Sequence, residues 1–205
     1  MIRKNKVLIC LLLVLTLIVS GVTSMAYTSS LTQPPSSWAV EYVDVAILLD
    51  LVPSNLQSQF TQPITRAEFA ALAVTLYEFW HGEIAGRSRF DDTNDTFVQK
   101  AAYIGVVNGV GNNRFDPNTS LTREQAATML SRLATAIGTP LPNRAPTFAD
   151  NDNISYWARN AVGQVQIAEI MTGIGSNMFS ARGPYTREQS IITIVRLTEF
   201  IVDAI

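Results

Sequence analysis

The chain has 205 residues, of which 47% are hydrophobic and 16% are charged, and its formal net charge is −2. This composition is typical of an ordered globular protein and excludes a disordered or collagen-like chain. With a single cysteine and a single histidine, a Cys/His zinc site is excluded, and a Ser-His-Asp triad would depend on His81 alone. The length suits one domain or a short array of small repeats.

The first 26 residues have the pattern of a secretory signal peptide. A basic start leads into an apolar run over residues 7–19 and then into small residues that suit cleavage after Ala26. An uncleaved anchor is the alternative, but the apolar run is shorter than the roughly 20 residues that a spanning helix needs. Cleavage would remove Cys10 and change the net charge from −2 to −5, because it also removes the basic residues Arg3, Lys4 and Lys6.

The charge pattern limits the partners of the exported chain. Lys100 is the only lysine after Ala26, and the arginines are scattered. A chain without a basic stripe is not suited to follow a phosphate backbone, so we expect no nucleic-acid partner. Once the signal peptide is cleaved, we also expect no membrane partner.

Residues 27–205 contain three copies of one unit. Three similar segments, ITRAEF, LTREQA and YTREQS, each place an arginine at the third position. These arginines lie 57 and 64 residues apart, and each follows a phenylalanine by six or eight residues. The arginines are Arg66, Arg123 and Arg187, and the phenylalanines are Phe60, Phe115 and Phe179. We therefore divide the chain into a signal peptide, residues 1–26, and repeats over residues 27–86, 87–143 and 144–205.

Each unit has the pattern of helix, loop and helix. A threonine before each arginine, with Glu or Gln three residues later, predicts a capping box at the start of the second helix. The pairs are Thr65 with Glu68, Thr122 with Gln125, and Thr186 with Gln189. First helices are predicted to begin near Trp38 and Trp157; in the second repeat Phe97 replaces the tryptophan, and the first helix is predicted to be about one turn short. The pattern predicts an all-α fold.

These units resemble the S-layer homology repeat, whose pattern runs F-x-D, W-A, an apolar helix, G-x-G, F-x-P and T-R-A-E. The third repeat matches most of this pattern, and the second matches much of it. The first has no F-x-D and lacks the glycine turn. Elements beyond the arginines and capping residues include Phe90, Asp92, Gly109, Gly111 and Pro117 in the second repeat and Phe148, Asp150, Trp157, Ala158, Gly173 and Gly175 in the third.

The resemblance implies a pseudo-threefold helical bundle with grooves between repeats that bind a secondary polymer of the bacterial cell wall. It implies a location at the cell surface, and a ligand whose sugars are typically pyruvylated and therefore anionic. The residues implied at the glycan are Arg66, Arg123, Arg187, Asp92, Asp150, Trp38, Trp157, Gly109, Gly111, Gly173 and Gly175.

The arginines favour the same chemistry for a physical reason. An arginine in the first turn opposes the helix dipole, so three of them indicate a shared function. A carboxylate ligand would accept bidentate hydrogen bonds from guanidinium and further bonds from the amides of the helix start. We expect Arg123 and Arg187 to lie at exposed helix starts. The alternatives are that the arginines pair with Asp92 or Asp150 inside the protein and that the tryptophans are core residues.

Other functions are less well supported by the sequence. The acidic runs at residues 91–95 and 150–153 lack the glycine and glutamate of a calcium loop, and we interpret them as capping and turn residues. No cofactor or metal is expected. No spacing of carboxylates selects a hydrolytic pair, so a glycan-active enzyme is the weaker hypothesis. A secreted structural or assembly protein with degenerate glycan sites, which contacts other surface-layer proteins, is the alternative to a wall-binding module.

Overall fold

The structure of this protein is a computed structural model that describes residues 33–205. The predicted signal peptide, residues 1–26, lies outside the described residues, and Cys10 lies there with it.

Short and long helices alternate along the described chain, and no strand occurs within residues 33–205. The α-helices are α2 (Val40–Leu48), α3 (Arg66–His81), α4 (Thr96–Tyr103), α5 (Arg123–Ile137), α6 (Arg159–Ile167) and α7 (Arg187–Asp203). Three short 3-10 helices complete them: η1 (Ser54–Leu56), η2 (Asn151–Asn153) and η3 (Tyr156–Ala158). The prediction of an all-α fold built from helix-loop-helix units is confirmed. No helix in the described part of the chain is long and apolar enough to span a bilayer.

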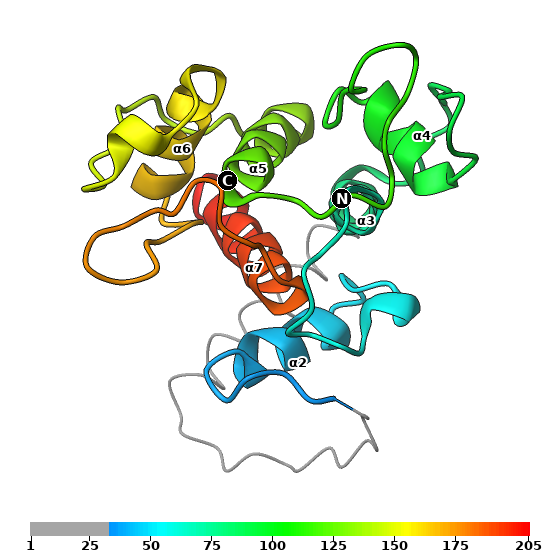
Figure 1. The fold of residues 1–205 in the computed structure, drawn as a ribbon. Coiled ribbons are helices and arrows are strands. Elements are labelled where there is room, and N and C mark those ends of the chain that lie inside the picture. The colour runs from blue at the N-terminus through cyan, green and yellow to red at the C-terminus, as the bar shows by residue number, and fades with distance from the viewer. Residues whose placement is uncertain (1–32) are drawn as a thin grey trace.

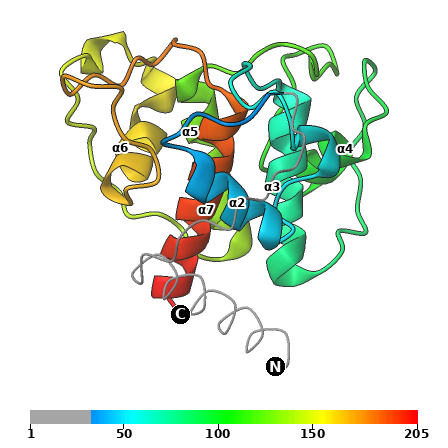
Figure 2. The same cartoon turned by 90° about the horizontal axis from the view of Figure 1, so that it is seen from below.

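The long helices form the centre of the molecule. Helices α3, α5 and α7 contact one another, while α4 packs on α3, α6 on α5 and α2 on α7 (Figure 1). A short helix therefore packs on the long helix of the preceding unit, and α2 completes the ring by packing on the last helix. The view from below shows α2 in front of α7, which it contacts (Figure 2). This is the pseudo-threefold bundle that the resemblance implies.

One continuous apolar core lies between these helices. The three phenylalanines that precede the arginines have no exposed surface, and leucines of the central helices, such as Leu72, Leu130 and Leu197, are buried with them. Burial of this kind supplies most of the free energy that holds short helices in place.

The long helices start close together around the central axis. The segments before them pair through isolated bridges: the amide of Ile64 donates to Tyr185 O at 2.8 Å, and the amide of Leu121 donates to Ile64 O at 2.9 Å. Each helix then begins with a capping box, in which the threonine hydroxyl and the N3 side chain satisfy one amide each.

The first helix of the second repeat is not a turn shorter than its equivalents, which corrects the prediction from sequence. Helix α4 has eight residues, and α2 and α6 have nine each. The second and third repeats differ instead in the segment before this helix. In the third repeat η3 carries Trp157 before α6 begins, whereas α4 begins directly after Asp95, whose carboxylate accepts from the amides of Phe97 and Val98.

We predict that Thr122→Ala lowers the free energy of unfolding by about 1 kcal/mol, because it removes the hydroxyl that accepts from the Gln125 amide. Urea denaturation followed by circular dichroism measures the change. Thr135→Ala, a matched substitution at an exposed position of the same helix, should change the stability by less than about 0.5 kcal/mol. Equal stabilities for the two variants would contradict a stabilising capping box.

Candidate functional site

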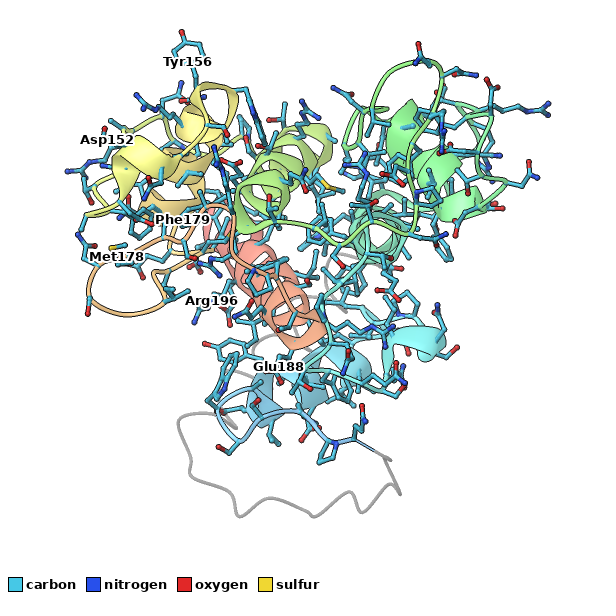
Figure 3. All side chains as sticks on the ribbon, in the orientation of Figure 1. Asp152, Tyr156, Met178, Phe179, Glu188 and Arg196 are labelled. Atoms are coloured by element: carbon cyan, nitrogen blue, oxygen red, sulfur yellow. The ribbon has the colours of Figure 1, made fainter. Side chains whose placement is uncertain are left out.

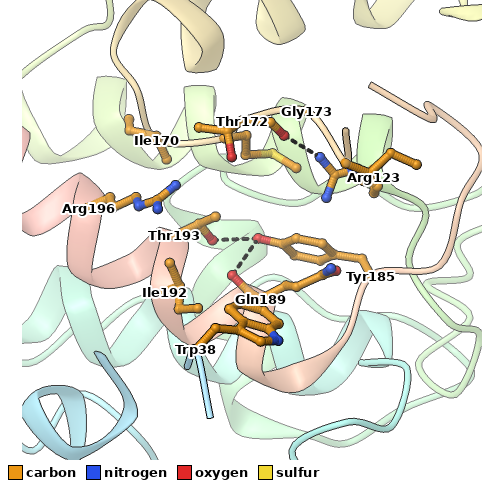
Figure 4. Close-up of a pocket in the computed structure, with 12 residues that line it drawn as sticks. Trp38, Arg123, Ile170, Thr172, Gly173, Tyr185, Gln189, Ile192, Thr193 and Arg196 are labelled. Carbon is orange, nitrogen blue, oxygen red and sulfur yellow. Dashed lines mark hydrogen bonds between the residues drawn. The ribbon is translucent and has the colours of Figure 1, made fainter. Parts of the chain in front are cut away.

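Two cavities lie at equivalent junctions between units. The larger, of about 320 Å³, contains Arg123 from the start of α5, Gly173 from the loop after α6, Gln189 and Arg196 from α7, and Trp38 from the turn before α2 (Figure 4). All three repeats therefore contribute residues to this cavity.

The second cavity, of about 180 Å³, has the same construction one unit earlier in the chain. It contains Arg66 from the start of α3, Gly109 from the loop after α4, Gln125 and Arg132 from α5, and Trp157 from η3. All ten residues that line it occupy positions equivalent to residues that line the larger cavity. The repetition shows that the shape follows from the repeat itself.

The arginine at each cavity is held by the loop of the next repeat. Arg66 donates from Nε to Phe115 O at 2.9 Å and from Nη2 to Asn108 O at 2.9 Å. The guanidinium also lies over the Phe115 ring, 4.5 Å from its centroid. Burial lowers the pKa of Arg66, but guanidinium remains charged at neutral pH.

Arg123 repeats this arrangement. Its Nε donates to Phe179 O and its Nη2 to Thr172 O, both at 2.7 Å, and burial lowers its pKa in the same way. Nη1 of Arg66 and Nη1 of Arg123 have no hydrogen-bond acceptor among residues 33–205, so each cavity retains a cationic donor for a ligand. Only 5% of Arg123 is exposed, so the expectation of an exposed helix start is wrong here, because the next repeat covers it.

The amides at the helix starts already donate hydrogen bonds within the protein. This corrects the expectation that they would bind a carboxylate ligand. The amides of Arg123 and Glu124 donate to Gly183 O and Ala181 O, and that of Gln125 donates to the capping hydroxyl. An anion at this cavity would therefore be bound by the arginine and not by the helix-start amides.

Asp92 and Asp150 do not line either cavity. The two carboxylate oxygens of Asp92 accept from the amides of Phe115 and Asp116, each at 2.8 Å. These bonds, with that of Phe115 first, lower the pKa of Asp92. The carboxylate holds the loop whose carbonyl groups bind Arg66, and no ion pair joins the two side chains.

Asp150 performs the same task in the third repeat. Its oxygens accept from the amides of Phe179 and Ser180 at 2.7 and 2.8 Å. Burial alone would raise the pKa of Asp150, but hydrogen bonds from the backbone, with the charge of Arg123, lower it overall. The predicted glycan residues Asp92 and Asp150 thus lie behind the cavities, where they position the loops.

The glycines of the two loops divide into two kinds. Gly109 and Gly173 line the cavities, and a Cβ atom on them would lie 2.7 Å from Arg114 O and 2.8 Å from Met178 O. Gly111 and Gly175 adopt φ of 105° and 118° in the turns beyond, and they line neither cavity. The first pair lets the two sides of each loop approach each other closely, and the second allows the turn.

The tryptophans are surface residues. Trp38 is 58% exposed and Trp157 is 56% exposed, so the alternative of core residues does not hold. Figure 3 shows Tyr156 pointing away from the protein at the tip of its lobe, next to Trp157 in the chain.

Sequence reasoning missed the residues that position these tryptophans. Glu124, which is 5% exposed, accepts from the amide and the hydroxyl of Ser155, both at 2.9 Å. Glu188, which is 3% exposed, accepts in the same way from Ser36. Each serine lies two residues before a tryptophan. The only signal in the sequence was the glutamate directly after Arg123 and Arg187, which the first repeat replaces with alanine.

The third junction differs from the other two. Arg187 forms a salt bridge with Glu68 at 2.6 Å and donates to Ser58 O, while its Nε is buried without a hydrogen-bond partner among the described residues. Glu68 occupies the position of Gln125 and Gln189. The cation at this junction is therefore neutralised inside the protein.

Comparison with known proteins agrees with this architecture. Residues 90–127 and 147–189 match the family model of the S-layer homology domain. These two ranges are therefore S-layer homology domains. The matched ranges fall in the second and third repeats; for the first, the structure shows the same capping box and the same position of the arginine in α3.

Three relatives are similar over most of the chain. An amylopullulanase of Thermoanaerobacterium thermosulfurigenes is 27% identical over 88% of the chain and 10% of its own length. Exoglucanase XynX of Acetivibrio thermocellus is 28% identical over 80% of the chain and 16% of its own length. An endoglucanase of Bacillus sp. (strain KSM-635) is 28% identical over 96% of the chain and 22% of its own length. This chain thus spans about a tenth to a fifth of the length of these relatives.

The lowered pKa of Asp150 predicts that the stability of the fold depends on pH. Because the pKa of Asp150 is lowered on folding, its contribution is complete above the ordinary aspartate pKa of about 4 and is lost as the pH falls below it. Asp150→Asn should cost about 2 kcal/mol at pH 7, since one buried amide loses its partner. The difference from the wild type should shrink at low pH.

Urea denaturation at neutral and acidic pH measures this effect. Asp152→Asn serves as the control, because the Asp152 carboxylate accepts no hydrogen bond within residues 33–205. If the free energies of unfolding of the wild type and Asp150→Asn differ by the same amount at every pH, the charged Asp150 carboxylate does not stabilise the loop.

The third junction allows a second test. Glu68→Gln keeps the capping box, since glutamine fills that position in the other two S-layer homology repeats, but it removes the ion pair with Arg187. We predict a loss of about 1–3 kcal/mol, between the values for exposed and buried pairs, and a smaller loss at high salt. Thermal and urea unfolding measure it, with the exposed Glu83→Gln as control. An unchanged stability would show that Glu68 acts only as a cap.

Proposed function

We propose that this protein is an exported module that anchors noncovalently to the bacterial cell wall and binds an anionic secondary wall polymer in the grooves between its repeats. The observation that carries the proposal is the pair of equivalent cavities, each with an arginine whose Nη1 has no partner among residues 33–205. No carboxylate residue lines either of them.

The ligand contacts follow from the geometry of the cavities. A carboxylate, such as that of a pyruvylated sugar, would accept from Nη1 of Arg66 or Arg123 in a charge-assisted hydrogen bond. The exposed ring of Trp157 or Trp38 offers a flat apolar surface to a sugar ring. In this proposal Gly109, Gly111, Gly173 and Gly175 with Asp92 and Asp150 shape the loops, and Arg187 belongs to a junction closed by Glu68.

The comparisons support anchoring over catalysis. The relatives are named as an amylopullulanase, an exoglucanase and an endoglucanase, and the similarity covers a small share of each. We propose that the shared part attaches such proteins to the wall. In this proposal the repeats span residues 27–86, 87–143 and 144–205. Arg66 and Arg123 would then serve two working grooves.

Binding to isolated cell-wall sacculi, before and after chemical removal of the secondary polymer, tests the proposal. We predict that the double variant Trp38→Ala/Trp157→Ala binds at least about ten-fold more weakly than the wild type. Both side chains are more than half exposed, so the fold should be kept.

Tyr156→Ala is the matched control, because this aromatic residue is 91% exposed, precedes Trp157 and lines neither cavity. It should bind as the wild type does. Cosedimentation of wild-type protein that persists after the polymer is removed would refute the proposal.

A further inference from the structure

Each cavity contains a second arginine that the function above does not use. Arg132 on α5 and Arg196 on α7 each lie nine residues after the arginine that starts the helix, and each lines one cavity. In Figure 4, Arg196 and Arg123 lie on opposite sides of the larger cavity. The two cations thus come from different helices and border one space.

Neither of these arginines forms a salt bridge within the described residues, although Glu199 on α7 interacts electrostatically with Arg196. No carboxylate within the described residues lies within salt-bridge distance of Arg132 or Arg196. Arg196 lies over the ring of Tyr42, 5.4 Å from its centroid. When the Asn108 amide is turned so that its oxygen faces Arg132, that oxygen accepts from Nη1 and Nη2 at 3.3 and 3.2 Å. The Tyr42 ring and the Asn108 amide carry no formal charge, so these contacts hold the guanidinium groups in place without an ion pair.

The third junction provides an internal comparison. Its helix α3 has Thr75 at the position equivalent to Arg132 and Arg196, and the Thr75 hydroxyl donates to Ala71 O within the helix. This is the same junction at which Arg187 is paired with Glu68. The second arginine is therefore present where the first is free of an acidic partner, and absent where the first is neutralised.

Two like charges beside one cavity repel each other, and the repulsion is relieved when anionic groups enter. A ligand with one acidic group would compensate the charge of only one of the two arginines. We propose that each open groove binds a doubly anionic segment of glycan, with one acidic group at Arg66 or Arg123 and a second at Arg132 or Arg196. This inference rests on the proposed function, since it specifies the charge of the same ligand.

The test compares three double variants of the purified protein on isolated sacculi at low and high salt. Arg132→Gln/Arg196→Gln removes both second cations, Arg132→Lys/Arg196→Lys retains their charge, and Arg89→Gln/Arg182→Gln removes two exposed arginines that line neither cavity. Unfolding midpoints establish that each variant is folded.

We expect the glutamine variant to bind at least about ten-fold more weakly at low salt, with a smaller further loss at high salt than the wild type shows. The lysine variant should keep the salt sensitivity of the wild type, and the surface variant should bind as the wild type does. If the glutamine variant binds as tightly as the wild type at every salt concentration, this inference is overturned and the proposed function stands. Absence of binding by the wild type would overturn both.

Discussion

Each long helix begins with an arginine whose guanidinium group reaches into the following repeat, and the rest of the bundle depends on this crossing. Arg66 bonds the carbonyl groups of Asn108 and Phe115, and Arg123 bonds those of Thr172 and Phe179. In the last repeat, Arg187 returns to the first and closes the ring. Because planar guanidinium has five donors in a rigid fork, one side chain satisfies two carbonyl groups and still has a donor left over.

The carboxylates support this crossing from behind. Asp92 and Asp150 hold the loops that supply the carbonyl groups, and Glu124 and Glu188 hold the turns that carry the tryptophans. Each of these carboxylates accepts from two donors, which compensates for the loss of water around it. An acidic chain thus forms two cavities lined by cations, since its nearby acids bond the backbone and serine hydroxyls outside the cavity walls.

The differences between the junctions arise from a few residues in the first and second repeats. The first long helix has Ala67 and Glu68 where the others have glutamate and glutamine, and the turn facing it has Phe97 where the others have tryptophan. Glu68 keeps its capping bond to Thr65 and also pairs with Arg187. The junction therefore gains an ion pair and loses the free cation, so its contribution is to the stability of the ring.

Sequence alone determined the features that depend on local patterns. Three capping boxes, the helical spacing of apolar residues and the turn glycines are short-range signals, and they sufficed for the helices and the repeat. The positions of Arg66, Arg123, Trp38 and Trp157 beside shared cavities also follow from the resemblance. The tertiary structure alone decided which repeat supplies each wall, that Arg123 is covered, and that Asp92 and Asp150 bond the backbone instead of lining a cavity. It also revealed the hydrogen bonds of Glu124 and Glu188 and the positions of Arg132 and Arg196 beside the cavities. These depend on contacts between residues far apart in the chain, and a hydrogen bond across a repeat boundary leaves no spacing that a one-dimensional pattern records.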